Sequence, residues 1–114
     1  MKIVIIDDEA DICFILAFEL KARQHQAVTF TSALDAQKYF ETDSADAIIC
    51  DFQMPSMNGY EFFLWLKSKD INTPFYMLTG EPSMDSEQIQ ACGIKHIFFK
   101  PHDLPKISKL FNPK

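Results

Sequence analysis

The sequence predicts a doubly wound α/β fold, in which helices cover both faces of a parallel five-stranded sheet. Five short runs of apolar and β-branched residues alternate along the chain with five stretches of helical pattern. Such alternation implies right-handed crossovers between parallel strands. A chain of 114 residues is long enough for one core. We therefore expect a single domain over residues 1–114, with no output domain in this chain.

The five strands are short runs bounded by turn residues. They are expected at residues 2–7 (KIVIID), 26–31 (QAVTFT), 45–51 (ADAIICD), 75–79 (FYMLT) and 96–100 (HIFFK). The third run is so apolar that it should lie deep in the sheet, yet it ends in Asp51. The fourth run follows the turn Asn72-Thr73-Pro74.

The five helices follow the strands in order. They are expected at residues 10–23, 33–40, 59–69, 83–92 and 103–111. Asp8 or Asp11 stands near the start of the first helix, where the helix dipole favours an anion. Ser32 is placed to cap the second helix, and Gly93 suits the C-terminal end of the fourth.

Composition and charge exclude several classes of function. The net charge is −5, from 11 basic and 16 acidic residues, which argues against direct binding to nucleic acid. No stretch reaches membrane-spanning length, and no secretion signal is evident, so we expect no membrane contact. Cys13, Cys50 and Cys92 form no CxxC pair, which favours a reduced, cytoplasmic setting. Cys50 and Cys92 are expected to be small apolar fillers of the core. The three histidines lack metal-ligand spacing and are expected at the surface: His25, His96 and His102.

Polar side chains stand at the end of four predicted strands. Asp7-Asp8-Glu9 ends the first, Asp51 the third, Thr79 the fourth and Lys100 the fifth. In doubly wound sheets, ligands bind beyond the carboxyl ends of the strands, where the strand order reverses. In the five-stranded, flavodoxin-like order 2-1-3-4-5, this point lies between strands one and three. The acidic clusters are therefore expected to meet at one edge of the sheet.

Carboxylates this close together repel one another and call for a divalent cation. Oxygen ligands suit Mg²⁺ or Mn²⁺. A carboxylate beside a cation, a lysine and a threonine can accept a phosphoryl group. Any one of these residues alone is more often structural, as a cap or a solvated turn residue. Their coincidence predicts that Asp51 is a nucleophile.

With these residues, the chain resembles the response-regulator receiver domains of two-component signalling over its whole length. The resemblance is carried by Asp7-Asp8-Glu9, "DFQMPSMNG" at 51–59, "LTG" at 78–80 and Lys100-Pro101. It implies that Asp51 accepts phosphate from a histidine kinase or a histidine phosphotransfer protein.

The resemblance also assigns roles to individual residues. Ligands of Mg²⁺ would be Asp7, Asp8, Asp51 and the backbone carbonyl of Gln53. Thr79 and Lys100 would contact the phosphoryl group, and the Lys100-Pro101 peptide would be cis. Pro55 and Gly59 would shape the loop that turns the Gln53 carbonyl toward the metal. Gln53 and Glu81 stand where the family tunes the lifetime of the phosphate.

One position departs from the family pattern. Receiver domains usually carry Tyr or Phe three residues before the lysine, and its ring moves inward with the threonine; here the residue is Ile97. Either Phe98 or Phe99 substitutes for it, or the output signal takes another route. The alternative is that both phenylalanines are core residues, and phosphorylation would then produce only a weak conformational response.

Two phenylalanines of the first helix are expected to lie on its surface and not in the core. If Ile12, Ile15, Leu16 and Leu20 face the sheet, then Phe14, Ala17 and Phe18 point away from it, with Cys13 beside them. Phe14 and Phe18, spaced i and i+4, would form an apolar surface strip. Because the first helix of receiver domains commonly helps to dock the phosphodonor, the resemblance implies that this strip binds a partner. A rotated helix is the alternative, because this orientation also buries Glu19 and Arg23.

From the sequence we expect a stand-alone receiver domain that phosphorylates itself and turns over no separate substrate. We expect a monomer or a weak, phosphorylation-dependent dimer that acts on an unknown downstream protein. A degenerate receiver that binds partners without phosphorylation is the main alternative. An aspartate-nucleophile phosphohydrolase would need a DxD motif, and a flavin-binding protein would need a hydroxyl-rich phosphate loop in place of "DDEAD".

Overall fold

The structure is a computed structural model that describes residues 1–80 and 86–111. Its centre is a parallel sheet with strand order β2-β1-β3-β4-β5, as predicted. The strands are β1 (Lys2–Ile6), β2 (Gln26–Phe30), β3 (Ala47–Asp51), β4 (Phe75–Thr79) and β5 (His96–Phe99). The helices are α1 (Ala10–Ala22), α2 (Ala33–Thr42), α3 (Gly59–Ser68), α4 (Ser86–Ala91) and α5 (Leu104–Leu110).

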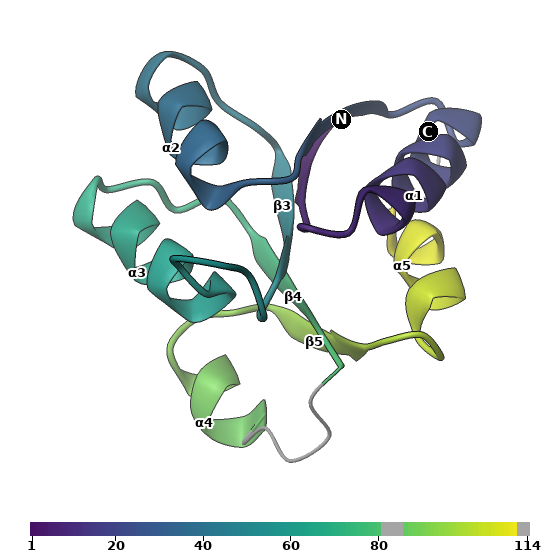
Figure 1. Cartoon of the computed structure of the whole chain (residues 1–114). Coiled ribbons are helices and arrows are strands. Elements are labelled where there is room, and N and C mark those ends of the chain that lie inside the picture. Colours follow the sequence, from purple (N-terminus) through teal and green to yellow (C-terminus); the bar gives the residue numbers. More distant parts are fainter. Residues whose placement is uncertain (81–85, 112–114) are drawn as a thin grey trace.

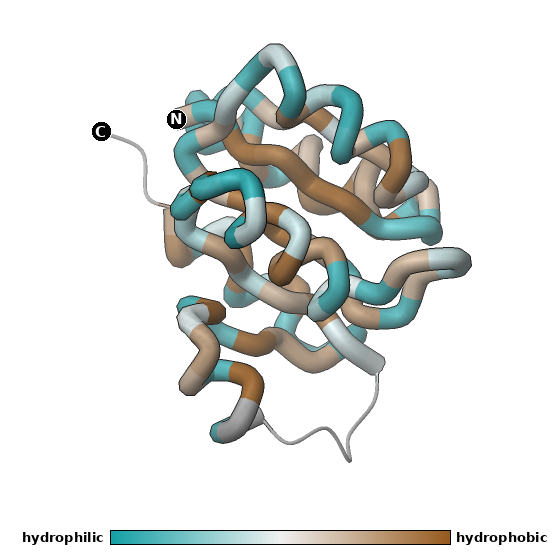
Figure 2. Tube along the Cα trace, turned by 90° about the vertical axis from the view of Figure 1, so that its left-hand side faces the viewer, coloured by the Kyte–Doolittle hydropathy of each residue, from teal (hydrophilic) through white to brown (hydrophobic). Residues whose placement is uncertain are grey.

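Helices cover both faces of the sheet, in three layers (Figure 1). Helices α1 and α5 pack on one face, and α2, α3 and α4 on the other. Residues of β1 and β3 alternate between the two core clusters, so Val4 and Ile48 meet the second group of helices while Ile3 and Ile49 meet the first. The trace is accordingly most hydrophobic through the middle of the molecule (Figure 2).

The predicted elements are all present, with shifted ends. Strand β3 begins at Ala47 instead of 45, and α2 continues to Thr42 instead of ending near Phe40. The predicted start of the fourth helix, at Ser83, lies outside the described residues. Ser32 caps α2, because its side chain accepts a hydrogen bond from the Asp35 N–H.

Helix α1 is rotated about its axis relative to the predicted orientation in which Ile12, Ile15, Leu16 and Leu20 face the sheet. Its buried residues are Cys13, Leu16, Ala17 and Leu20. The small side chains of Cys13 and Ala17 let the helix lie close to the sheet, and Ile15 is therefore 42% exposed. The predicted exposure of Ala17 and burial of Ile15 were wrong. The predicted exposure of Phe14 and Phe18 is confirmed.

Two further predictions, that His25 lies at the surface and that Cys92 lies in the core, were wrong. His25 is buried, and it joins the two ends of the described chain: the Met1 nitrogen donates to Nδ1 at 3.2 Å, and Nε2–H donates to the Phe111 carbonyl at 2.7 Å. Cys92, expected in the core, is exposed directly after α4, and its Sγ lies 3.5 Å from the Tyr60 hydroxyl. Cys50 is buried as expected. Among the described residues, no helix is long and apolar enough to cross a membrane.

Candidate functional site

Three carboxylates meet at the carboxyl edge of the sheet, where β1 and β3 lie side by side. Asp7 follows β1 directly and Asp51 is the last residue of β3. One oxygen each of Asp7, Asp8 and Asp51 lies within 4.8 Å of the others. Asp7 and Asp51 are buried, whereas Asp8 is exposed. The predicted meeting of the two acidic clusters is confirmed.

Asp7 is fixed by hydrogen bonds from both sides. Its N–H donates to the Phe30 carbonyl at 3.0 Å, and its Oδ1 accepts from the Glu9 N–H at 2.8 Å. The Cys13 thiol donates to the Asp7 carbonyl at 3.3 Å. This role of Cys13 could not be predicted from the sequence, because a cysteine on an apolar helix face is indistinguishable from a core residue.

Lys100 brings the positive charge to this cluster. Its Nζ lies 2.8 Å from Asp7 Oδ2, 3.3 Å from Asp51 Oδ1 and 3.8 Å from Glu9 Oε1. Its backbone N–H donates to the Thr79 carbonyl at 2.8 Å, which ties the end of β5 to β4. The Lys100-Pro101 peptide is cis, as predicted.

The acids outnumber the lysine, and the pKa values reflect this. Burial, and then the negative charge of Asp7, raise the pKa of Asp51 to about 7, although Lys100 opposes the shift. Burial also raises the pKa of Asp7, against the opposing contacts from Lys100 and the Glu9 N–H. Burial alone would lower the pKa of Lys100, but Asp7 and Asp51 together raise it. The site therefore disfavours two ionised buried carboxylates unless more positive charge is supplied.

The chemistry of these groups fits a divalent cation. Asp7 Oδ2 is buried, and its partner is the ammonium group of Lys100 at 2.8 Å, which also lies 3.3 Å from Asp51 Oδ1. One lysine cannot balance two buried carboxylates and the neighbouring Asp8, and a divalent cation would supply the missing positive charge. The acidic triad Asp7, Asp8 and Asp51 can bind such an ion. Oxygen ligands favour Mg²⁺ or Mn²⁺ over softer metals.

The loop after Asp51 folds back over the end of β3. The Gly59 N–H donates to the Phe52 carbonyl at 2.8 Å, and a Cβ at Gly59 would collide with the Asp51 carbonyl oxygen. Helix α3 starts there with a capping box, in which Asn58 and Glu61 each accept from the other's backbone N–H. Gly59 is therefore needed for close approach of the loop to the site.

Several predicted site residues lie nearby. Thr79 is fully buried at the end of β4. Gln53 and Pro55 are exposed in the loop, and the Gln53 side chain reaches toward Gly80. The role of the Gln53 carbonyl as a metal ligand stays a prediction, and Glu81 lies outside the described residues.

The packing of strand β5 shows whether Phe98 or Phe99 lies beside Thr79. Ile97 and Phe98 are both buried, on opposite faces of the sheet, with Phe98 in the core against α1 and α5. Phe99 lies on the Ile97 face, pairs in register with Thr79 and is half-buried. Phe98 is thus a core residue, and Phe99 is the aromatic residue next to Thr79.

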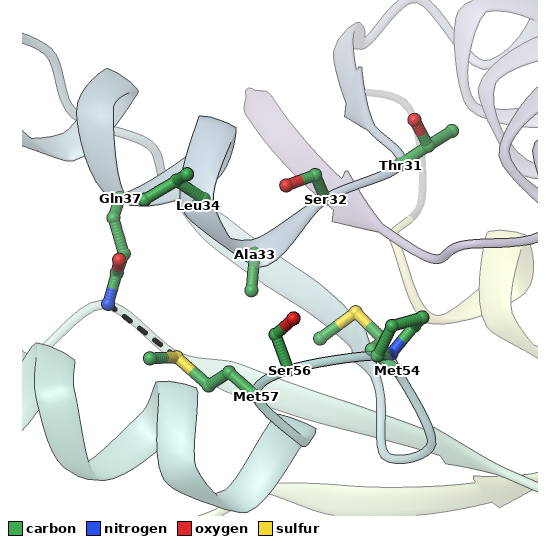
Figure 3. Close-up of a pocket in the computed structure, with 9 residues that line it drawn as sticks. Thr31, Ser32, Ala33, Leu34, Gln37, Met54, Ser56 and Met57 are labelled. Atoms are coloured by element: carbon green, nitrogen blue, oxygen red, sulfur yellow. Dashed lines mark hydrogen bonds between the residues drawn. The ribbon is translucent and has the colours of Figure 1, made fainter.

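A groove that the sequence did not indicate runs beside the site, between the start of α2 and the loop after β3 (Figure 3). Its volume is about 390 Å³. The side chains of Met54, Ser56 and Met57 line the loop side, and Gln37 Nε2 donates to Met57 Sδ across it at 3.5 Å. The loop is thus in contact with α2 as well as with β3.

Comparison with known proteins gives one family. The sequence profile described as "Response regulator receiver domain" matches residues 3–112. Among curated proteins, the "Alkaline phosphatase synthesis transcriptional regulatory protein PhoP" of Bacillus subtilis is 30% identical over 94 residues, 82% of this chain and 38% of its own length. The "Heme response regulator HssR" of Staphylococcus haemolyticus is 30% identical over 108 residues, 94% of this chain and 48% of its own. The chain thus spans less than half the length of these relatives.

Solved structures show the same fold. The receiver domain of the Francisella response regulator 1452 superposes with a TM-score of 0.88 at 20% identity, covering 96% of this chain and 91% of its own. CheY4 of Vibrio cholerae gives 0.83 at 27% identity, covering 96% and 93%. The response regulator TrrA of Thermotoga maritima, solved in complex with Mg(2+)-BeF, gives 0.82 at 21% identity, covering 96% and 94%.

Proposed function

The chain belongs to the response regulator receiver domain family, and we propose that it takes a phosphoryl group onto Asp51 in a reaction that depends on a divalent cation. It would pass the signal on through protein contacts and turn over no separate substrate. Phosphoryl acceptance is typical of the family. The observation that carries the proposal is the buried Asp51 carboxylate, 3.3 Å from Lys100 Nζ and within 4.8 Å of Asp7 and Asp8.

Asp51 would act as the nucleophile. A carboxylate oxygen forms a bond to phosphorus while the bond from phosphorus to the donor histidine nitrogen breaks, and that nitrogen keeps the electron pair and takes up a proton from solvent. Lys100 would supply positive charge to the phosphoryl oxygens, and the Thr79 hydroxyl would donate a hydrogen bond to one of them. Burial of Asp51 excludes water from the nucleophile and strengthens both interactions.

A divalent cation fits beside the nucleophile. The residues that would hold Mg²⁺ or Mn²⁺ are Asp7, Asp8 and Asp51 through their carboxylates, and Gln53 through its backbone carbonyl. When bound, such a cation offsets the negative charge of the phosphoryl oxygens.

The proposed donor is a histidine kinase or a histidine phosphotransfer protein, which implies the cytoplasm as the place of action. Phe14 and Phe18 lie on α1, which starts three residues after Asp7, and they are 71% and 67% exposed. We assign this apolar surface to contact with the donor, because a partner could bury these two exposed rings without any change in the core. The downstream partner is a protein that recognises the phosphorylated form.

The test is the intact mass after incubation with a small-molecule phosphodonor, with and without Mg²⁺. The wild type should gain one phosphoryl group only with Mg²⁺, and Asp51→Asn should gain none. Asp43→Asn is the matched control, because Asp43 is an exposed aspartate beside a lysine at the opposite edge of the sheet. A gain in Asp51→Asn equal to that of the wild type would refute Asp51 as the acceptor.

A second candidate function, a receiver that binds partners without phosphorylation, is favoured by one observation. Ile97 occupies a fully packed position in the core and offers no ring that could move with Thr79. Absence of any gain in mass in the wild type, with small-molecule and phosphohistidine donors alike, would favour this reading.

A further inference from the structure

The outer face of α1 carries a strip of four exposed side chains, the α1 strip: Asp11, Phe14, Phe18 and Lys21. Their spacing of three, four and three residues is that of the a and d positions of a heptad, which form the seam between two paired helices. Helix α1 lies on the outside of the molecule, with its opposite face against the sheet and α5 (Figure 1). The strip has no covering element among the described residues.

The two phenylalanines make this face unusually apolar for a surface. They are 71% and 67% exposed, and their rings stack with centroids 6.4 Å apart. On the other helices, by contrast, large exposed apolar side chains occur singly: Leu34 on α2, Leu64 on α3 and Leu110 on α5. An adjacent exposed pair marks an interaction surface more strongly than scattered single residues do.

We propose that the α1 strip pairs with the α1 strip of a second copy of this chain, antiparallel and about a two-fold axis. In that arrangement, a positions face d positions. Phe14 then packs against Phe18 of the second copy, and Asp11 lies opposite Lys21 of the second copy. The two-fold axis repeats both contacts, so the interface is closed and self-complementary.

The charges select this orientation over the alternatives. An antiparallel pair places an aspartate opposite a lysine at both ends of the seam. A parallel pair would place Asp11 opposite Asp11 and Lys21 opposite Lys21, which like-charge repulsion disfavours. Ile15, 42% exposed, lies beside the seam and extends the apolar contact.

The size of the strip implies weak association. Three apolar side chains per copy bury well below the roughly 800 Å² per partner of a standard stable interface. We therefore expect a dissociation constant on the order of 10⁻⁴ M. Because the proposed donor surface uses the same Phe14 and Phe18, self-association would withdraw it from the donor. This consequence rests on the proposed function, whereas the association itself does not.

The experiment is sedimentation velocity of the whole unphosphorylated chain, from about 10 µM to about 1 mM, in about 150 mM salt. The weight-average mass should rise from one chain toward two. Phe14→Gln with Phe18→Gln should abolish the rise, while the matched control Leu64→Gln should not. Circular dichroism of each variant checks that α1 is intact.

Charge exchange tests the orientation. Asp11→Lys alone, or Lys21→Asp alone, should raise the dissociation constant about tenfold, because each places like charges opposite at both ends. The double variant Asp11→Lys with Lys21→Asp should restore wild-type association. A chain that stays monomeric throughout, or association that survives the glutamine variants, overturns the proposal. Failure of the double variant to recover overturns the antiparallel pairing. The mass assay with a small-molecule phosphodonor is independent of these outcomes and tests Asp51 separately.

Discussion

Two lysine–aspartate contacts at opposite edges of the sheet have the same length and opposite character. At the amino edge, Lys2 Nζ lies 2.8 Å from Asp43 Oδ1, with side chains 25% and 51% exposed. At the carboxyl edge, Lys100 Nζ lies 2.8 Å from Asp7 Oδ2, with side chains 12% and 0% exposed. The hydrogen bond from Lys2 lowers the pKa of Asp43, whereas burial raises the pKa of Asp7 and takes that of Asp51 to about 7.

The difference shows that distance alone does not make a site. At the amino edge, water solvates both partners and one acid meets one base, so the contact fastens β1 to the segment before β3. At the carboxyl edge, desolvation is combined with an excess of carboxylates over lysine. That excess leaves affinity for a further positive group, which is what a phosphoryl-transfer site requires.

The largest expected effect is a difference in the free energy of unfolding between variants of Lys100 and Lys2. Lys100→Met should lower the free energy of unfolding by about 3 kcal/mol at pH 8 without divalent cations, because two buried carboxylates lose their counter-charge. Lys2→Met, the matched variant, should leave the urea midpoint almost unchanged, because its partner stays solvated. Urea unfolding followed by the fluorescence of Trp65 measures both. Equal losses in the two variants would remove the distinction between the edges.

The next effect concerns the titration of Asp51. Its folded pKa of about 7 lies above the value of an unfolded aspartate, so the folded state binds this proton more tightly. The contribution of Asp51 to the free energy of unfolding therefore becomes less favourable as the pH rises from about 4 to about 7, and is constant above that range. Asp51→Asn should stabilise the metal-free protein by about 1–3 kcal/mol at pH 8, with no gain at pH 4.

The comparison that isolates this effect is the difference between Asp51→Asn and the wild type at each pH. It should grow through the window from pH 4 to 7. Asp43→Asn should show no such growth, because the pKa of Asp43 is lowered and its ionised form is the favoured one. A flat difference for Asp51→Asn would mean that burial does not perturb this carboxyl.

The fold and the acidic site were predictable because both depend on signals that are local in the sequence. Apolar runs that end at Asp7 and Asp51 identify two strands, and the known order of five-stranded doubly wound sheets places these strands side by side, so the acids meet at one edge. The orientation of α1 could not be predicted, because it is decided by the close packing of Cys13 and Ala17 against the sheet. The spacing of apolar residues along a helix does not indicate how closely the helix approaches the sheet. The burial of His25 was missed for a related reason. Its two hydrogen-bond partners, Met1 and Phe111, are distant in the sequence.

The smallest predicted effect tests the cation directly. At about ten times its dissociation constant, Mg²⁺ should raise the free energy of unfolding of the wild type by about 1.4 kcal/mol. Asp8→Asn, compared with its own metal-free stability, should lose most of this gain, because Asp8 is exposed and is one of the three carboxylates that could hold the ion. Asp43→Asn at the opposite edge should keep the gain in full. Urea midpoints with MgCl₂, and with KCl at equal ionic strength, measure the three proteins. An equal gain with KCl, or in Asp8→Asn, would show that the stabilisation is general screening of a net charge of −5 rather than binding at the acidic triad.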